Sequence, residues 1–292
     1  TLQNVRNGSG AACRDASRVF RIRNLLCWFD RPQSAKSSPL YPHSYNHNND
    51  MTDAAVNTQL QVHYATMWDR SFGAVARGDI DCDTRLAAGR DLRRGLTLIA
   101  RPSPALQARF EFLLDRLALC EPQQYRYPVT DMHLTILPLF TAIENPVSEL
   151  AQLNDYIDSV RAALDGIEAF DIKFHGITMS RSAVLAQGFP CGPALETLRE
   201  RLRTQLRDAG LDASLDQRYR LITAHSTLFR FVAPLHHPQH FAAQLGSLRD
   251  EPLGCMRVNE VELVVNDWYM SSSSLDRIAK VPLPTPISYV GP

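Results

Sequence analysis

Two stretches, DMHLTILPLF at residues 131–140 and ITAHSTLFRF at residues 222–231, decide the fold of this chain. Each places a histidine two residues before a threonine inside an apolar run: His133 and Thr135 in the first, His225 and Thr227 in the second. Side chains of a β-strand alternate between its two faces, so residues two apart share a face. The pattern therefore predicts two strands that each present an imidazole and a hydroxyl side by side.

The elements around the two stretches repeat in the same order. Each half of the chain reads β-α-β-α-β with the His-x-Thr strand in the middle, and proline opens three of the four helices. The predicted strands cover residues 94–102, 131–139, 170–174, 182–189, 221–231 and 261–265. The predicted helices begin at Pro104, Pro193 and Pro238 or cover residues 147–165. This repeat predicts a bilobal α/β (α+β) domain, duplicated with pseudo-two-fold symmetry about a central cleft.

The first 50 residues differ from the rest in composition. They are rich in Asn, Ser, Pro and Gly and show no sustained periodicity, so they bury too little apolar surface to offset the entropy of ordering. We expect residues 1–50 to be a disordered extension or non-native upstream sequence. Residues 51–90 are expected to form a helical segment that packs on the domain, and residues 91–286 to form the domain itself.

Composition limits the classes of function. The chain has 292 residues with 31 basic and 31 acidic side chains, which argues against strong non-specific binding to a nucleic-acid backbone but leaves room for a small phosphate ligand or one RNA end in a cleft. No apolar run reaches the roughly 18 residues of a membrane span. The six cysteines form no CxxC pair, which argues against a disulfide framework and against zinc. We expect a cytoplasmic monomer that needs no membrane, metal or cofactor.

The two His-x-Thr pairs suit phosphodiester chemistry if they meet in one cleft. One neutral imidazole can take a proton from water or a ribose hydroxyl, and the other, protonated, can give one to the leaving oxygen. An ordinary imidazole pKa near 6.5 makes both forms accessible. Thr135 and Thr227 can donate hydrogen bonds to phosphate oxygens. A single His-x-Thr pair is usually structural, and only the repetition of the pair favours catalysis by His133 and His225.

With both motifs in place, the chain resembles the two-histidine (2H) phosphoesterase superfamily, close to the bacterial LigT-like 2′-5′ RNA ligase group. The resemblance covers roughly residues 90–285. It implies a bilobal fold, no metal in the chemistry, and action on 2′,3′-cyclic phosphates or 2′-5′ phosphodiesters. It assigns His133 and His225 to acid–base catalysis and Thr135 and Thr227 to phosphate binding. Ser226 departs from the family pattern, which has a hydrophobic residue there.

Three further side chains are weaker candidates for substrate binding. Many members of the resembled group carry an arginine after the second histidine, and Arg230 matches it. The alternative places Arg230 on the opposite face of the strand, because positions 225 and 230 differ in parity. Tyr125 and Tyr219 precede the two motifs and could stack on a base, or else pack under a loop.

The histidines of LHHPQH, residues 235–240, resemble a metal cluster at first sight. Pro238 between them instead indicates the start of a helix, and no cysteine or carboxylate completes a ligand set.

These observations predict an RNA-processing hydrolase that opens 2′,3′-cyclic phosphates or 2′-5′ bonds at RNA ends or in small nucleotides. One alternative is a phosphodiesterase for another small cyclic phosphate, such as an ADP-ribose derivative. The other is a module that binds RNA ends or nucleotides without turnover. Turnover, as opposed to binding alone, distinguishes the enzymes from the module.

Overall fold

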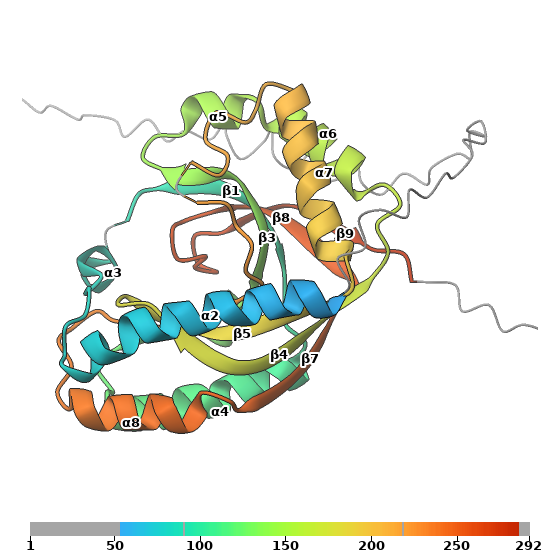
Figure 1. The fold of residues 1–292 in the computed structure, drawn as a ribbon. Coiled ribbons are helices and arrows are strands. Elements are labelled where there is room, and N and C mark those ends of the chain that lie inside the picture. The colour runs from blue at the N-terminus through green and yellow to red at the C-terminus, as the bar shows by residue number, and fades with distance from the viewer. Residues whose placement is uncertain (1–52, 90, 218, 286–292) are drawn as a thin grey trace, which may run out of the picture. The chain divides into compact units, whose positions relative to one another are not determined.

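The computed structural model describes residues 53–89, 91–217 and 219–285, and the predicted extension over residues 1–50 lies outside them. The described residues form two sheets, each with helices packed against it (Figure 1). All strand pairs in both sheets are antiparallel.

The first sheet has four strands in the order β3-β1-β8-β9, and the second has five in the order β2-β6-β5-β4-β7. The strands of the first sheet are β1 (Arg94–Ala100), β3 (Leu134–Ile143), β8 (Glu260–Asn266) and β9 (Asp276–Pro282). Those of the second are β2 (Tyr125–Arg126), β4 (Phe170–Met179), β5 (Ala183–Cys191), β6 (Ser226–Arg230) and β7 (Pro252–Val258).

The two sheets are related by the predicted duplication. The trio β3-β1-β8 of the first sheet corresponds to the trio β6-β5-β4 of the second, with each His-x-Thr strand at the same place in its trio. The last strand of each half crosses to the other sheet, because β4 of the first half pairs in the second sheet and β8 of the second half pairs in the first. The predicted two-lobed, duplicated α+β fold is confirmed, and this exchange of strands joins its lobes.

Helices from both halves pack on each sheet. Against the second sheet lie α2 (Asp53–Ala76), α4 (Pro104–Cys120) and α8 (Pro238–Leu248). On the first sheet, α7 (Ala194–Asp208) contacts β3, and α6 (Leu153–Leu164) contacts α7. Three short helices complete the described chain: α3 (Thr84–Ala88), α5 (Val147–Ala151) and the 3-10 turn η2 (Val129–Asp131).

Local sequence explains several helix ends. The side chain of Ser103 caps α4 by accepting a hydrogen bond from the amide of Leu106, and Pro104 occupies the first turn. The helix predicted over residues 147–165 is instead two helices, α5 and α6, separated at Gln152. Nothing in the sequence around Gln152 explains this break.

The first described helix, α2, lies across the second sheet (Figure 1). Its buried side chains Leu60, Tyr64 and Trp68 recur every four residues, which is the spacing of one helix face. This face packs against β4, β5 and α8. No helix formed by the described residues is both long and apolar enough to cross a membrane.

Candidate active site

Residues of both His-x-Thr motifs line one cavity of about 220 Å³. His133 and Thr135 line it from the first sheet, and His225, Thr227 and Arg230 line it from the second. The other lining residues are Thr97, Tyr127, Pro138, Phe140, Thr141, Ala142, Asp216, Gln217, Tyr219, Leu221, Asn266, Trp268 and Met270. The structure therefore brings together the four residues of the two pairs, as the shared-cleft hypothesis requires.

Matching irregularities in β3 and β6 shape this cavity. In β3, Thr135 and Leu137 pair with consecutive residues of β1, so Ile136 is an extra residue, or β-bulge. In β6, Thr227 and Phe229 pair with consecutive residues of β5, so Leu228 is the extra residue. A bulge shifts the alternation of side chains by one position.

The bulge at Leu228 settles where Arg230 points. Thr227 pairs with Leu185 and Arg230 pairs with Ala183, and these two residues of β5 share a face. Thr227 and Arg230 therefore also share a face, although their positions differ in parity. The alternative, in which parity places Arg230 on the opposite face, does not hold, because the extra residue Leu228 lies between Thr227 and Arg230.

His133 lies immediately before β3 and has a defined tautomer. Its Nδ1 is 2.7 Å from the carbonyl oxygen of Asp131. A carbonyl can only accept, so Nδ1 carries the hydrogen and, in the neutral ring, Nε2 keeps its lone pair. Burial lowers the pKa of His133 to about 4, and the positive charges of Arg101 and Arg230 act in the same direction.

His225 lies immediately before β6 and has a different partner. Its Nδ1 is 2.8 Å from the hydroxyl oxygen of Thr223, a buried residue. Among the described residues this hydroxyl has no other partner, and it can either donate to Nδ1 or accept a hydrogen bond from it. Burial lowers the pKa of His225 to about 4, and nearby positive charge, including Arg199 and Arg230, lowers it further.

Arg230 is held by aromatic side chains. Its Nε donates to the hydroxyl of Tyr127 at 2.9 Å. The guanidinium lies 5.9 Å from the ring centre of Tyr127 and 5.6 Å from that of Tyr269. The hydroxyl of Tyr269 in turn donates to Asp83, the residue that caps α3. The position of Arg230 is thus fixed by the hydrogen bond from its Nε and by the two aromatic rings near its guanidinium.

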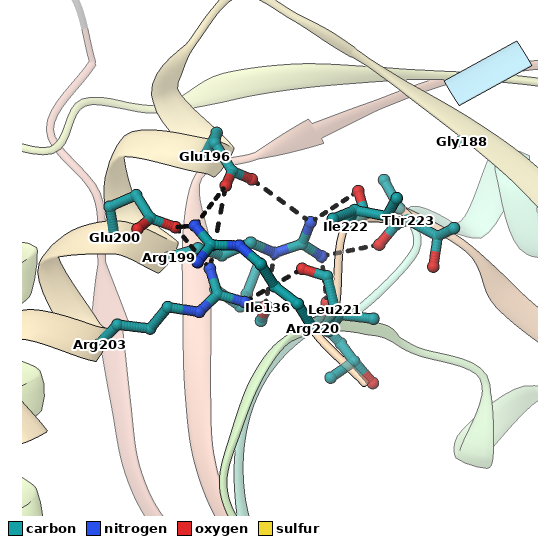
Figure 2. A network of polar contacts seen from close by, with 12 residues as sticks. Ile136, Gly188, Glu196, Arg199, Glu200, Arg203, Arg220, Leu221, Ile222 and Thr223 are labelled. Atoms are coloured by element: carbon teal, nitrogen blue, oxygen red, sulfur yellow. Dashed lines mark hydrogen bonds and ion pairs between the residues drawn. The ribbon is translucent and has the colours of Figure 1, made fainter. Parts of the chain in front are cut away.

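A buried arginine on α7 connects the two motif segments (Figure 2). Arg199 is 1% exposed and donates to the carbonyls of Ile136 at 2.8 Å and Thr135 at 3.1 Å, at the bulge of β3. It also donates to the carbonyls of Thr223 at 2.8 Å and Ile222 at 3.2 Å, just before His225. One guanidinium therefore binds four carbonyl oxygens and connects the first motif to the second.

The charge of Arg199 is costly to bury, and burial lowers its pKa to about 10. Glu196, one turn earlier on α7, lies 4.0 Å away and offsets part of this cost. The sequence carries one signal for this residue. Arg199 falls on the helix face of Leu195, Leu198 and Leu202, where an arginine interrupts the apolar pattern.

The two tyrosine candidates lie in different places. Tyr219 lines the cavity and is 67% exposed, which places it at the rim. Tyr125 pairs with Arg230 across β2 and β6, and its ring packs edge-on against Tyr127 at 5.2 Å. It lies next to the cavity but is not among the residues that line it.

Sequence reasoning missed several lining or supporting residues. Trp268, in the loop after β8, lines the cavity, and the guanidinium of Arg93 lies 4.0 Å from its ring centre. Thr223 was also missed, although it lies two residues before His225. His236, His237 and His240 border a separate depression, and within the described ranges no three metal-ligating side chains gather into a metal site.

Several solved structures are distantly similar to this chain. The protein TT0787 of Thermus thermophilus is 17% identical, with a TM-score of 0.47 over 66% of this chain and 99% of that one. E. coli LigT in its apo form is 14% identical, with a TM-score of 0.43 over the same shares of 66% and 99%. Usb1 of Kluyveromyces marxianus with uridine monophosphate is 14% identical, with a TM-score of 0.38 over 66% and 99%.

No curated protein matches the chain. The sequence model of the 2′-5′ RNA ligase superfamily does match it, over residues 102–268, a range that holds both His-x-Thr motifs and more than half of the chain. On that match the chain belongs to the 2′-5′ RNA ligase superfamily, and its resemblance to the two-histidine phosphoesterases is confirmed.

Proposed function

We propose that this protein is a metal-independent phosphodiesterase that opens 2′,3′-cyclic phosphates or 2′-5′ phosphodiester bonds at RNA ends or in small nucleotides. One observation carries the proposal: two imidazoles, two threonine hydroxyls and one arginine line a single cavity. Superfamily membership supports the same class of chemistry.

The charge of the cavity suits a phosphodiester. Among its described lining residues, Arg230 and Asp216 are charged, and Asp216 is engaged by Arg203 at 2.6 Å. The low pKa values of His133 and His225 keep both imidazoles largely neutral near pH 7. The cavity therefore offers about one unit of positive charge to its ligand. A phosphodiester carries one negative charge, so the two match.

The hydrogen-bond partners of the histidines suggest their roles. His133 keeps a free lone pair on Nε2, which suits a general base that takes a proton from the attacking water. His225 has a hydroxyl partner that can accept from Nδ1–H, so the protonated ring can present its Nε2 hydrogen to the leaving oxygen and keep the Nδ1 hydrogen afterwards. We assign His133 as the base and His225 as the acid.

The reaction then balances, with three bonds formed and three broken. The oxygen of water bonds to phosphorus while its proton passes to Nε2 of His133. The bond from phosphorus to one ribose oxygen breaks, and that oxygen takes the proton from Nε2 of a protonated His225. A bound phosphodiester favours this protonation, because its negative charge lies beside the ring. Thr135, Thr227 and Arg230 donate hydrogen bonds to the phosphate oxygens.

The test is hydrolysis of 2′,3′-cyclic nucleotides, 2′-5′ dinucleotides and an ADP-ribose cyclic phosphate in the presence of EDTA. The proposal expects turnover that survives the chelator and falls at least 100-fold in His133→Ala and in His225→Ala. His240→Ala, an exposed histidine of α8, is the matched control. Binding without turnover of any substrate would instead favour a nucleotide-binding module.

A further inference from the structure

We propose that Tyr64 of α2 is a positioning residue for His225, so that a helix preceding the matched superfamily domain takes part in the site. The inference rests on the function proposed above. The family match begins at residue 102, whereas α2 ends at Ala76. Tyr64 is 1% exposed and reaches the backbone of the residue directly before His225.

The contact lies where the second sheet stops pairing. β5 and β6 pair as far as Ala186 and Ser226, so the amide of Ala224 lies beyond the ladder. The hydroxyl of Tyr64 accepts from this amide at 3.1 Å and donates to the carbonyl of Gly188 at 3.2 Å. The hydroxyl of Tyr64 therefore bridges β5 and the segment that leads to His225 at a point where the two backbones are not paired directly.

Gly188 makes this approach possible. A Cβ atom at this position would lie 1.9 Å from the carbonyl oxygen of Ala224, which no side chain could tolerate. The absence of a side chain lets the segment before β6 pass close to β5. The hydroxyl of Tyr64 then fits between the two backbones.

Tyr64 is itself held firmly. Its backbone carbonyl accepts a hydrogen bond from the hydroxyl of Thr178 on β4 at 2.9 Å. Its ring packs edge-on against Phe189 at 5.5 Å. Because the backbone and the ring of Tyr64 are both fixed, the position of its hydroxyl is fixed too. The position of the Ala224 amide therefore depends on the position of α2.

The short segment before His225 is thus held by two outside residues. Arg199 binds the carbonyls of Ile222 and Thr223, and Tyr64 binds the amide of Ala224. Thr223 in turn orients the ring of His225. Loss of the Tyr64 hydroxyl leaves a buried amide without a partner and frees the peptide adjacent to the catalytic ring.

The experiment compares Tyr64→Phe with Tyr156→Phe in the full chain. Both substitutions remove one hydroxyl from a buried tyrosine, and the hydroxyl of Tyr156 on α6 has no hydrogen-bond partner among the described residues. We expect Tyr64→Phe to lower kcat about tenfold with KM unchanged within twofold, because a small misplacement of a catalytic group slows the chemical step more than binding. Tyr156→Phe should leave both constants within twofold of the wild type.

A second readout does not need turnover. The ring NMR signals of His225 and His133 are titrated without substrate in each variant. The charges that act on His225 come from His133, from Arg199 on α7, from Arg230 on β6 and from His63 on α2. In Tyr64→Phe these groups stay, but the loosened segment admits water, so the titration of His225 should move toward that of an ordinary imidazole while that of His133 stays.

The two readouts separate the possible failures. If the wild type is inactive but the titration of His225 alone shifts in Tyr64→Phe, the phosphodiesterase proposal is refuted and the positioning role of Tyr64 is supported. Equal behaviour of Tyr64→Phe and Tyr156→Phe in kcat and in the His225 titration overturns the positioning role. Equal shifts of His133 and His225 in Tyr64→Phe also overturn it, since they indicate a general loosening of the fold.

Discussion

Arg230 and Pro138 occupy equivalent places in the two halves of the cavity. Each lies three residues after the motif threonine, beyond a one-residue bulge, and each lines the cavity. The two halves of the cavity are therefore similar in backbone structure but differ in charge at this position. The second half supplies a guanidinium where the first half supplies a proline ring, so a bound phosphate meets its permanent positive charge from one side.

We predict that Arg230→Met lowers kcat/KM by about 10- to 100-fold, because charge-assisted hydrogen bonds of this kind contribute about 1.5–3 kcal/mol. Steady-state kinetics on a 2′,3′-cyclic nucleotide measures the effect. Arg207→Met, on the exposed side of α7, removes the same charge elsewhere and should change kcat/KM less than twofold. Equal losses in both variants would show that net charge, and not contact with the phosphate, is responsible.

The pH profile of kcat/KM should peak in acidic solution, near the pKa of about 4 that the two histidines share. In the free protein the pKa values of His133 and His225 are both about 4. The neutral base His133 is present above that pH, while the protonated acid His225 is lost as pH rises through it, so kcat/KM falls toward pH 7. The profile of kcat should lie at higher pH, because bound phosphate favours the protonated ring. A kcat/KM maximum at or above pH 6.5, the ordinary imidazole value, contradicts this prediction.

The same lowered pKa values predict that folding stability falls in acid. His133 and His225 bind protons more weakly in the folded state than in the unfolded state, so stability is present above pH 6.5 and is lost as pH falls toward 4. Between pH 7 and pH 5 the loss is at most about 2 kcal/mol for each histidine, and less where the ring keeps some exposure.

Urea unfolding of the wild type at the two pH values measures this loss. The variant His133→Gln/His225→Gln is the control, and its stability should change less between the two pH values. A wild type and variant with the same pH dependence would exclude the two histidines as its origin.

Arg199→Lys should disturb both motifs at once. A lysine ammonium has three N–H donors and cannot bind all four carbonyls that the guanidinium binds, so at least one acceptor loses its partner and the link between the two motif segments is weakened. We expect a loss of about 2–4 kcal/mol in the free energy of unfolding and a drop in kcat of about 100-fold. Thermal unfolding and kinetics on the folded fraction measure the two effects.

Arg203→Lys is the matched control on the same helix. Arg203 binds the carbonyl of Leu221 and the carboxylate of Asp216, with no contact to the first motif. Its substitution should lower kcat much less than Arg199→Lys does. A similar drop in both would mean that holding the second segment alone is sufficient.

Ser226→Ala should stabilise the protein or leave its stability unchanged. Ser226 is 1% exposed, and its hydroxyl has no hydrogen-bond partner in the described part of the chain. A buried, unpaired hydroxyl costs about 1–3 kcal/mol, which alanine removes together with the group. A clear fall in the melting temperature of Ser226→Ala would reveal a partner that the structure does not show.

Local patterns predicted the order of elements and the meeting of the two motifs. Apolar periodicity and helix-opening prolines are properties of short windows, so Pro104, Pro193 and Pro238 marked their helices correctly. The strand face that carries Arg230 was harder to predict, because it depends on the extra residue Leu228 and no local sequence pattern marks a bulge there. An alternation rule applied without the bulge gives the opposite face.

The supporting residues could not be found in the same way. Tyr64 contacts Ala224 across most of the chain, and Arg199 contacts Ile136 and Thr223 from a third element. In the sequence, Tyr64 is one more residue on the apolar face of a helix. Its role depends on a hydroxyl reaching an amide that the sheet leaves unpaired, which is a property of the folded chain.

The crossing of β4 and β8 between the sheets has a consequence for the integrity of the chain. A break in the turn between β4 and β5 would yield two fragments that share both sheets. The strand β4 of the first fragment pairs with β5 and β7 of the second, and β8 of the second fragment pairs with β1 of the first. Neither fragment could complete a sheet alone, and neither holds both histidines. The proposed activity would therefore return only when the two fragments are mixed.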